Sequence, residues 1–421
     1  MARAMLLAVC SLAALGPAQE PAAPAMLLRV VSNQGRWVEP FAERLGVTVP
    51  VLAEGQQVEL VLTAGRPATA RVAESPFLRR TLVVEVRAAA WLDRAAAAVR
   101  EAERDLTVRA EGFAKLCGLP GAGVRSLCRQ AFDVARSLDS VVAVVTQVGQ
   151  GRDYDVRLEF VPLTDSAFAA WLGTIAPAAG APARLPWTDA AVRLAFALQP
   201  DSFAATCEPF LGIVSAFAAN RDAEAAQAEA RALLPLLDGS FHACLRPGRL
   251  GLVYGLRDAD AFAARANDPQ RLRRQQEDLA SQRIEAEYTP AAATYRGVPL
   301  LLSRVRSQTP VPALADADGW VVAFGARVGS LWLQVGGGEQ PQDSMKSAID
   351  DALAGRLRGP STASPDGAER AWLTCEVDLV RLGAIAASTT DAAADTGDAP
   401  SRLQMSLSCS PHTLKALIQL R

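Results

Sequence analysis

The chain has 421 residues, of which 50% are hydrophobic and 21% charged, and its 43 basic and 45 acidic side chains give a net charge of −2. A chain this apolar is expected to fold, and its length suits two or three domains. Its balanced charge argues against a dedicated nucleic-acid-binding protein. Its only histidines are His242 and His412, so a zinc site of three histidines is excluded.

The N-terminus has the features of a secretory signal peptide. Arg3 precedes a short apolar run over residues 5–15, and Ala18 ends a group of small residues where cleavage is expected. We therefore expect residues 1–18 to be removed and the mature protein to be periplasmic or extracellular. Cys10 raises the alternative of lipidation, although Val9 is a poor residue before a lipidated cysteine. No later segment is apolar for long enough to predict a transmembrane helix.

Six cysteines follow the predicted signal peptide, an even number that an oxidising compartment allows to pair. Pairing between neighbours in the sequence would join Cys117 with Cys128, Cys207 with Cys244, and Cys375 with Cys409. The alternative is six buried thiols that pack as small hydrophobic side chains. The sequence has no CxxC motif, so nothing supports a redox or zinc-ribbon role.

The first half of the chain alternates strands with helices. The residue pattern predicts a strand over 82–86, an amphipathic helix over 92–106 and a second helix over 123–138. The segment 141–148 is apolar on both faces, and 154–160 alternates between apolar and polar residues. With the glycine-rich turn between them, these two segments predict a β-hairpin.

A short motif recurs at three places where a strand is expected to lead into a helix. Each copy has an Asp or Ser as the helix cap and then a phenylalanine: Phe168, Phe203 and Phe262. The irregular spacing of the copies excludes a solenoid. We interpret the motif as a repeated strand-to-helix joint, in which the phenylalanine packs the helix on the sheet, rather than as a ligand-binding motif.

The second half of the chain is expected to start after the segment 174–187, which is rich in Pro, Ala and Gly and marks a domain boundary or a long loop. We therefore predict an N-terminal domain over 19–175 and a C-terminal domain over 176–421. Strands are predicted at 192–198, 241–245, 250–256, 320–325, 331–335, 373–379 and 403–409. Helices are predicted at 222–234, at 269–287 with proline in its first turn, and after Ser410 and Pro411.

Cys375 and Cys409 lie on the apolar faces of the last two predicted strands, so a disulfide between them is open if those strands are antiparallel neighbours. Antiparallel hairpins dominate the whole pattern. We therefore predict an α+β fold, in which amphipathic helices pack on antiparallel sheets through loosely repeated strand–helix units.

The order of motifs within residues 236–353 carries a resemblance. Leu237-Asp238-Gly239 precedes a hairpin, Tyr254-Gly255-Leu256 leads into a helix, and Gly297-Val298-Pro299 and Asp318-Gly319-Trp320 follow. This succession resembles a bacterial exported family that is known as a domain of unknown function. The resemblance implies an exported α+β protein and nothing about a reaction or substrate.

The motifs that carry common enzyme chemistry are missing from the sequence: it has no P-loop, GxSxG, HExxH or kinase motif. Asp316 and Asp318 resemble part of a calcium loop that lacks its distal Glu. Ser344 and Lys346 are two residues apart on a predicted helix and do not face each other. We predict no catalytic, cofactor-binding or metal-binding residue, and we expect His242 to be a buried core residue.

Three functions remain open. The leading hypothesis is a non-catalytic binding or scaffold role, with a protein partner, in the cell envelope or outside the cell. The alternative is a carrier of a lipid or other apolar ligand, because apolar helices packed on extended sheets can enclose a cavity. The third hypothesis is a hydrolase that uses acidic side chains alone, although no pair of carboxylates stands out.

Overall fold

The computed structural model describes residues 26–94, 96–116, 121–149, 153–178, 189–211, 223–281, 284–307, 320–327, 330–336, 340–354, 371–382, 402–410 and 412–420. The chain forms two compact units. Unit 1 comprises Met1–Arg109, Cys128–Gly173 and Cys409–Arg421, and unit 2 comprises Ala110–Leu127 and Thr174–Ser408. Antiparallel strand pairs and helices make up both units, which confirms the predicted α+β class.

Unit 1 is built on an antiparallel sheet with the strand order β16-β6-β5-β4-β1-β2-β3. Its strands are β1 (Met26–Ser32), β2 (Gln56–Thr63), β3 (Thr69–Glu74), β4 (Thr81–Val86), β5 (Leu138–Val148), β6 (Asp153–Pro162) and β16 (Thr413–Leu420). Its helices include α2 (Gly35–Leu45), α3 (Ala88–Arg94) and α6 (Ala167–Leu172). The helices α4 (Ala96–Leu116) and α5 (Gly121–Arg136) each contribute residues to both units.

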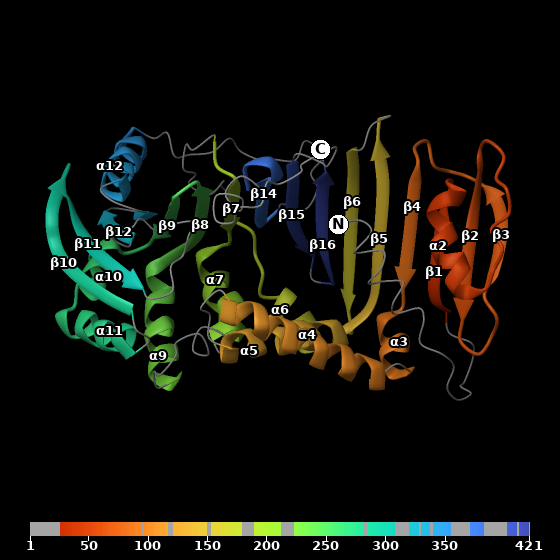
Figure 1. Cartoon of the computed structure of the whole chain (residues 1–421), viewed down its shortest axis with the longest axis horizontal. Helices are drawn as coiled ribbons and strands as arrows, with labels where there is room; N and C mark the ends of the chain where they lie inside the picture. The colour runs from red at the N-terminus through yellow and green to blue at the C-terminus, as the bar shows by residue number, and fades with distance from the viewer. Residues whose placement is uncertain are drawn as a thin grey trace. The chain divides into compact units, whose positions relative to one another are not determined.

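The core of unit 1 lies between α2 and the sheet. Val38, Phe41 and Ala42 of α2 are buried on an apolar side of the sheet that includes Val30 and Leu60, and Figure 1 shows α2 alongside β1 and β2. Burial of these side chains is the main stabilising contribution here. The indole of Trp91 in α3 donates a hydrogen bond of 2.8 Å to the carbonyl of Leu27, which fixes α3 at the end of β1.

Unit 2 contains an antiparallel sheet with the order β10-β11-β12-β13-β9-β8-β7-β14-β15. Its strands are β7 (Val192–Ala197), β8 (Leu237–Arg246), β9 (Arg249–Leu256), β10 (Ile284–Tyr295), β11 (Val298–Ser307), β12 (Trp320–Arg327), β13 (Ser330–Gly336), β14 (Leu373–Asp378) and β15 (Arg402–Ser410). Its helices include α7 (Pro200–Cys207), α9 (Ala223–Leu233), α10 (Ala259–Ala266), α11 (Pro269–Ser281) and α12 (Gln340–Leu353), with short 3₁₀ turns at Glu208–Phe210 and Leu234–Leu236.

Helices cover both sides of this second sheet. On one side, α12 packs on β12 and β13, as Figure 1 shows, and buries Met345 and Ile349 in a cluster with Trp332. On the other side, α10 buries Phe262 against Leu331. Since each side of the sheet has its own apolar cluster, unit 2 has three layers around β8, β9, β12 and β13.

The repeated strand-to-helix joint has the predicted cap at two of its three copies. The Ser166 hydroxyl accepts a hydrogen bond from the Ala169 amide at the start of α6, and the Asp258 carboxylate accepts one from the Ala261 amide at the start of α10. The third copy, at α7, has no side-chain cap at Gln199. The three phenylalanines of the motif, Phe168, Phe203 and Phe262, are all buried.

Two predicted helices are wrong in part or in full. The helix predicted over 269–287 ends at Ser281, and strand β10 begins at Ile284. The predicted C-terminal helix is strand β16 instead, which pairs with β6 from Leu414 to Leu420. Both segments alternate between apolar and polar residues and pair with a neighbouring strand. The free energy of that pairing outweighs the small intrinsic helix propensity of the residues, so both segments are strands.

Candidate binding surface

The strands β16, β6 and β5 of unit 1 present a continuous apolar surface on one side of the sheet. The register aligns their side chains in cross-strand rows. We call this surface the apolar face, and it consists of Val141, Ala143 and Val145 of β5, Val156, Leu158 and Phe160 of β6, and Leu414, Ala416 and Ile418 of β16. Successive side chains of a strand point to opposite sides, so the charged residues of β6 lie on the other side.

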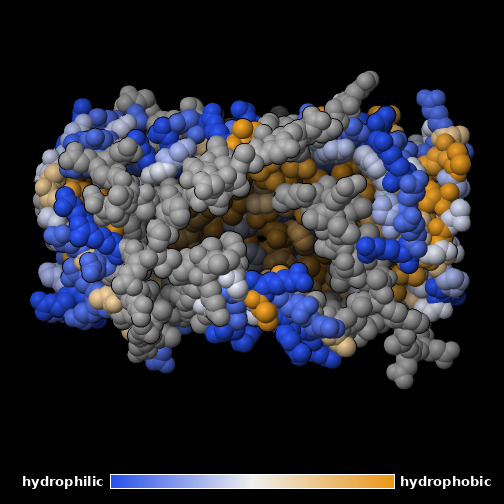
Figure 2. Space-filling model, in the orientation of Figure 1, coloured by the Kyte–Doolittle hydropathy of each residue, from blue (hydrophilic) through white to orange (hydrophobic). Residues whose placement is uncertain are grey.

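Much of the apolar face stays accessible to solvent. Val156, Leu158 and Ala416 are buried, but the other six side chains keep intermediate exposure. In Figure 2, hydrophobic residues are visible on the surface in the region of the unit 1 strands. An accessible apolar surface of this kind is typical of a ligand-binding groove or a protein interface.

One end of the apolar face is polar. Beyond the three apolar rows, Gln147 of β5, Tyr154 of β6 and Leu420 of β16 form a fourth cross-strand row, next to the row of Val145. The Arg80 guanidinium donates a 3.4 Å hydrogen bond to the Gln147 amide oxygen, and the rings of Trp37 and Tyr154 are 6.3 Å apart. The apolar face is therefore bordered at one end by polar side chains, which include the positively charged guanidinium of Arg80.

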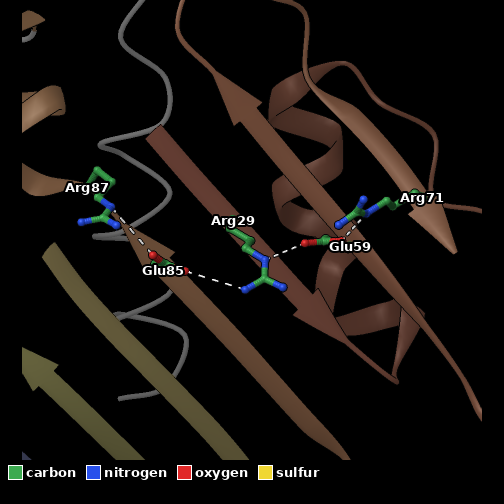
Figure 3. Close-up of polar contacts among 5 residues, drawn as sticks. All are labelled: Arg29, Glu59, Arg71, Glu85 and Arg87. Carbon is green, nitrogen blue, oxygen red and sulfur yellow. Dashed lines mark hydrogen bonds and ion pairs between the residues drawn. The ribbon is translucent and has the colours of Figure 1, made fainter. Parts of the chain in front are cut away.

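The opposite side of the unit 1 sheet carries a charge ladder, which we define as a row of side chains with alternating sign. It runs through Arg71 of β3, Glu59 of β2, Arg29 of β1, Glu85 of β4, Arg87 just after β4, and Asp139 of β5. Figure 3 shows five of these residues pointing toward one another across the strands. Because positive and negative charges alternate, the ladder favours one order and register of strands rather than an anionic or cationic ligand.

Glu59 is the central acid of the ladder. It is 5% exposed, and it accepts hydrogen bonds from Arg71 and, at 2.6 Å, from Arg29. Burial by itself raises the pKa of Glu59, but the hydrogen bonds and charges of Arg71 and Arg29 outweigh burial and hold the pKa below its ordinary value of 4.5. A carboxylate held ionised in this way is a structural ion pair and a poor proton donor.

The expected disulfides are not formed in this structure. None of Cys128, Cys207, Cys244, Cys375 and Cys409 forms a disulfide, and Cys117 lies outside the described residues. The strands β14 and β15 are antiparallel neighbours, which was the condition for a Cys375–Cys409 disulfide, but their register places Cys375 opposite Met405 instead of Cys409. The four-residue offset along β15 separates the two cysteines by about 13 Å, too far for a bridge.

The thiols are also poorly suited to nucleophilic chemistry. Burial raises the pKa of Cys207 to about 11. Burial, together with the charge of Glu376, raises the pKa of Cys375. Because the thiolate is the reactive form, both thiols are held in the inert form near neutral pH.

The other residues singled out in the sequence do not converge on one site. His242 is buried on β8 beside Cys244, as expected for a core residue. Lys346 pairs with Asp343, while Ser344 accepts a hydrogen bond from Arg249, so Ser344 and Lys346 form no dyad. His412 is exposed and directly precedes strand β16. Asp316 and Asp318 lie outside the described residues, as do residues 1–18 and Cys10.

Comparison with protein-family models, with curated proteins and with solved structures finds no match to this chain. The resemblance over residues 236–353 therefore stays a prediction. Among the described helices, none combines the length and hydropathy needed to span a membrane. No group of three or more His, Cys, Asp and Glu side chains gathers in the described residues as a metal site would require.

Sequence reasoning missed the apolar face and the charge ladder. The alternation of apolar and polar residues predicts β6, but the capping pattern at Ser410 and Pro411 predicts a helix where β16 lies, and no strand is predicted at β1, β2 or β3. A signal was present in both cases: Leu414, Ala416, Ile418 and Leu420 alternate as in a strand, and Arg29, Glu59 and Arg71 lie in short alternating segments.

Proposed function

We propose that the protein has a non-catalytic binding function and that its ligand is an amphiphile, with an apolar chain and one polar head. This proposal joins the binding role with the carrier role considered from the sequence. The half-exposed apolar face of unit 1 carries it. A rigid surface of nine apolar side chains, free of charge over three rows, favours the burial of a hydrocarbon chain.

The length and the ends of the apolar face favour an amphiphile over a plain hydrocarbon. From Val141 to Gln147 the strand β5 rises by about 20 Å, enough for an extended acyl chain. Arg80, Gln147 and Tyr154 lie at one end only. A cation at that end favours a carboxylate or another anionic head, since charge-assisted hydrogen bonds are stronger than neutral ones.

The state of the titratable groups supports a role without catalysis. Glu59 is held ionised between two arginines, and burial holds the thiols of Cys207 and Cys375 in the protonated form. Active sites instead contain acids, bases and nucleophiles whose pKa values lie close to the working pH. The predicted signal peptide, residues 1–18, supports a site of action outside the cytoplasm.

Two neighbouring valines of β5 provide a matched test. Val145 belongs to the apolar face, whereas Val144 points to the opposite side of the same strand, and both have intermediate exposure. Binding of a fluorescent long-chain carboxylic acid to the mature full-length chain would be measured for Val145→Gln and Val144→Gln. Loss of one valine contact is worth about 1.5 kcal/mol, so Val145→Gln should weaken binding about tenfold, and Val144→Gln should leave it within about twofold.

The polar end is tested with the same probe. Arg80→Gln should weaken binding of the carboxylic acid and leave binding of the corresponding fluorescent alcohol unchanged. Circular dichroism would establish that each variant is folded. Absence of binding by the natural chain, or equal losses in Val145→Gln and Val144→Gln, would refute the proposal. Native mass spectrometry of the mature protein from its own envelope or medium would then identify the ligand by its mass.

A further inference from the structure

Strand β3 ends the sheet of unit 1 with an open edge. Among the described strands only β2 pairs with it, and it lies last in the strand order, as Figure 1 shows. All of its residues are exposed except Ala70, which keeps intermediate exposure. An open edge of this kind is a template for a further strand, because its outer main-chain donors and acceptors face solvent.

The hydrogen bonds beside β3 show which main-chain groups point outward. The amide of Ser75, directly after the strand, donates a hydrogen bond of 2.8 Å to the carbonyl oxygen of Gly55, directly before β2. Successive residues of a strand direct their main-chain groups to alternate sides, so every second residue back from Ser75 faces β2. The remaining residues of β3 direct their N–H and C=O groups away from β2: Ala70, Val72 and Glu74.

The edge strand of unit 2 differs in this respect. Strand β10 carries the exposed Glu285 and Glu287, and it contains Pro290, where its pairing with β11 is irregular. Charges, proline and bulges are the devices that keep an edge strand from pairing with another chain. In β3 there is no proline, the pairing with β2 has no register shift, and Arg71 is already paired with Glu59. Strand β3 therefore lacks most of these protective features.

Exposed apolar side chains accompany the open edge. Val72, in the middle of β3, is 39% exposed, and Val51 and Leu78 are 98% and 102% exposed. Val51 shortly precedes Gly55 and Leu78 shortly follows Ser75, so both are close in the chain to the pair that ends the β2–β3 ladder. Large apolar side chains that gather beside an open edge are typical of a protein interface.

From these observations we infer that β3 pairs with β3 of a second copy of this chain, antiparallel and with a two-fold axis at Val72. Val72 then lies opposite the partner's Val72, and Ala70 lies opposite the partner's Glu74. All the outward main-chain groups of both strands are used, in about six hydrogen bonds. Arg71 lies opposite the partner's Ala73, so no like charges oppose each other, whereas a register centred on Arg71 would place two guanidinium groups face to face.

This complementarity of β3 with itself favours a second copy over an unrelated partner, since closed two-fold dimers are the commonest assemblies of soluble proteins. About six hydrogen bonds correspond to an interface of roughly 600–1,200 Å². An interface of that size suits a weak, reversible dimer with a Kd on the order of 10 µM. The dimer does not depend on ligand binding to the apolar face, because β3 and β16 lie at opposite ends of the unit 1 sheet.

Sedimentation velocity of the mature full-length chain at about 1 to 100 µM should show a reversible dimer. Val72→Lys places two cations opposite each other at the two-fold axis and should weaken the dimer about tenfold or more. Thr289→Lys is the matched control, because Thr289 is an exposed residue of the other edge strand, β10. This control should leave the dimer within about twofold of the natural chain.

A cross-link reports the register directly. Opposite residues of a hydrogen-bonded antiparallel pair have Cα atoms about 5.5 Å apart, which suits a disulfide. Val72→Cys should therefore form an intermolecular disulfide on mild oxidation. Glu74→Cys should not, because position 74 of the partner lies opposite Ala70, about 13 Å away along the strand.

Three results would each overturn the inference: a chain that stays monomeric at about 100 µM, a dimer that Val72→Lys leaves intact, and cross-linking through Glu74→Cys as fast as through Val72→Cys. A monomer whose β3 amides gain protection from hydrogen exchange only on binding a different protein would assign the edge to that protein, and would also overturn it.

Discussion

Replacement of Glu59 by glutamine tests the charge ladder of unit 1. The substitution keeps the shape of the side chain and removes the charge that Arg29 and Arg71 share. A hydrogen bond to a charged group contributes about 1.5–3 kcal/mol when buried, but the side chains of Arg29 and Arg71 are 43% and 72% exposed, so solvent screens both pairs. With the contribution of Arg29 discounted for this screening and none counted for the exposed Arg71, Glu59→Gln should destabilise the protein by about 1 kcal/mol at neutral pH.

The dependence on pH gives this prediction a sign. The pKa of Glu59 is lower in the folded protein than its ordinary value of 4.5. The stabilisation is therefore complete above pH 4.5 and is lost as the pH falls through the lower, folded pKa. Urea unfolding followed by tryptophan fluorescence at pH 7 and again at the acid end of the stable range should show the difference between Glu59→Gln and the natural chain shrinking in acid.

An acid on the same sheet provides the control. Glu74 is exposed on the edge strand β3, and Glu74→Gln should change the free energy of unfolding by less than about 0.5 kcal/mol. If Glu59→Gln behaves like Glu74→Gln, or if its effect is the same at both pH values, the ladder does not stabilise unit 1 as argued.

Three further changes test the packing of unit 2 and the state of the thiols. Gly239 has a φ of +85°, and an added Cβ would lie 2.6 Å from the Leu198 carbonyl oxygen, whereas Gly248 has a φ of +68° with nothing within 4 Å. In thermal unfolding Gly239→Ala should therefore cost about 2 kcal/mol more than Gly248→Ala, and equal costs would contradict the close approach. Phe203→Ala should lower the free energy of unfolding by about 3–4 kcal/mol, because Phe203 is 6% exposed and stacks on Phe196. Phe210 is 41% exposed, so Phe210→Ala should lower it by less than half as much. Similar losses of stability in the two variants would show that Phe203 is not a core contact. Alkylation at pH 8 should modify the thiol of Cys207 slowly in the folded chain, because burial raises its pKa to about 11, and at the ordinary rate in denaturant. If peptide mapping finds the six cysteines after the predicted signal peptide oxidised in pairs, the disulfides expected from the sequence are favoured over reduced thiols.

The fold class and many of the strands can be predicted from local residue patterns. Alternation of apolar and polar residues is a local property, so the β5–β6 hairpin and the β8–β9 hairpin could be identified without any tertiary information. Helix caps are equally local, so the Asp or Ser of the repeated motif predicts the caps that Ser166 and Asp258 form. The burial of His242 followed from its apolar neighbours on a strand.

Which strands pair, and in what register, depends on contacts between distant segments of the chain. Cys375 and Cys409 could be placed on the right faces of adjacent strands, but only the register shows that they lie four residues apart. The C-terminal segment becomes a strand because β6 offers it a free edge of hydrogen-bonding groups, and no local signal reports that edge.

The candidate sites depend on the same long-range information. The apolar face joins β5 and β6 to a strand more than 250 residues later, and the charge ladder joins four strands with Asp139. The neighbours of a residue in the sequence determine its local conformation and the side of the sheet on which its side chain lies. Its partners on adjacent strands depend on strand order and register. These are long-range properties, because the free energy of strand pairing depends on segments that are far apart in the chain.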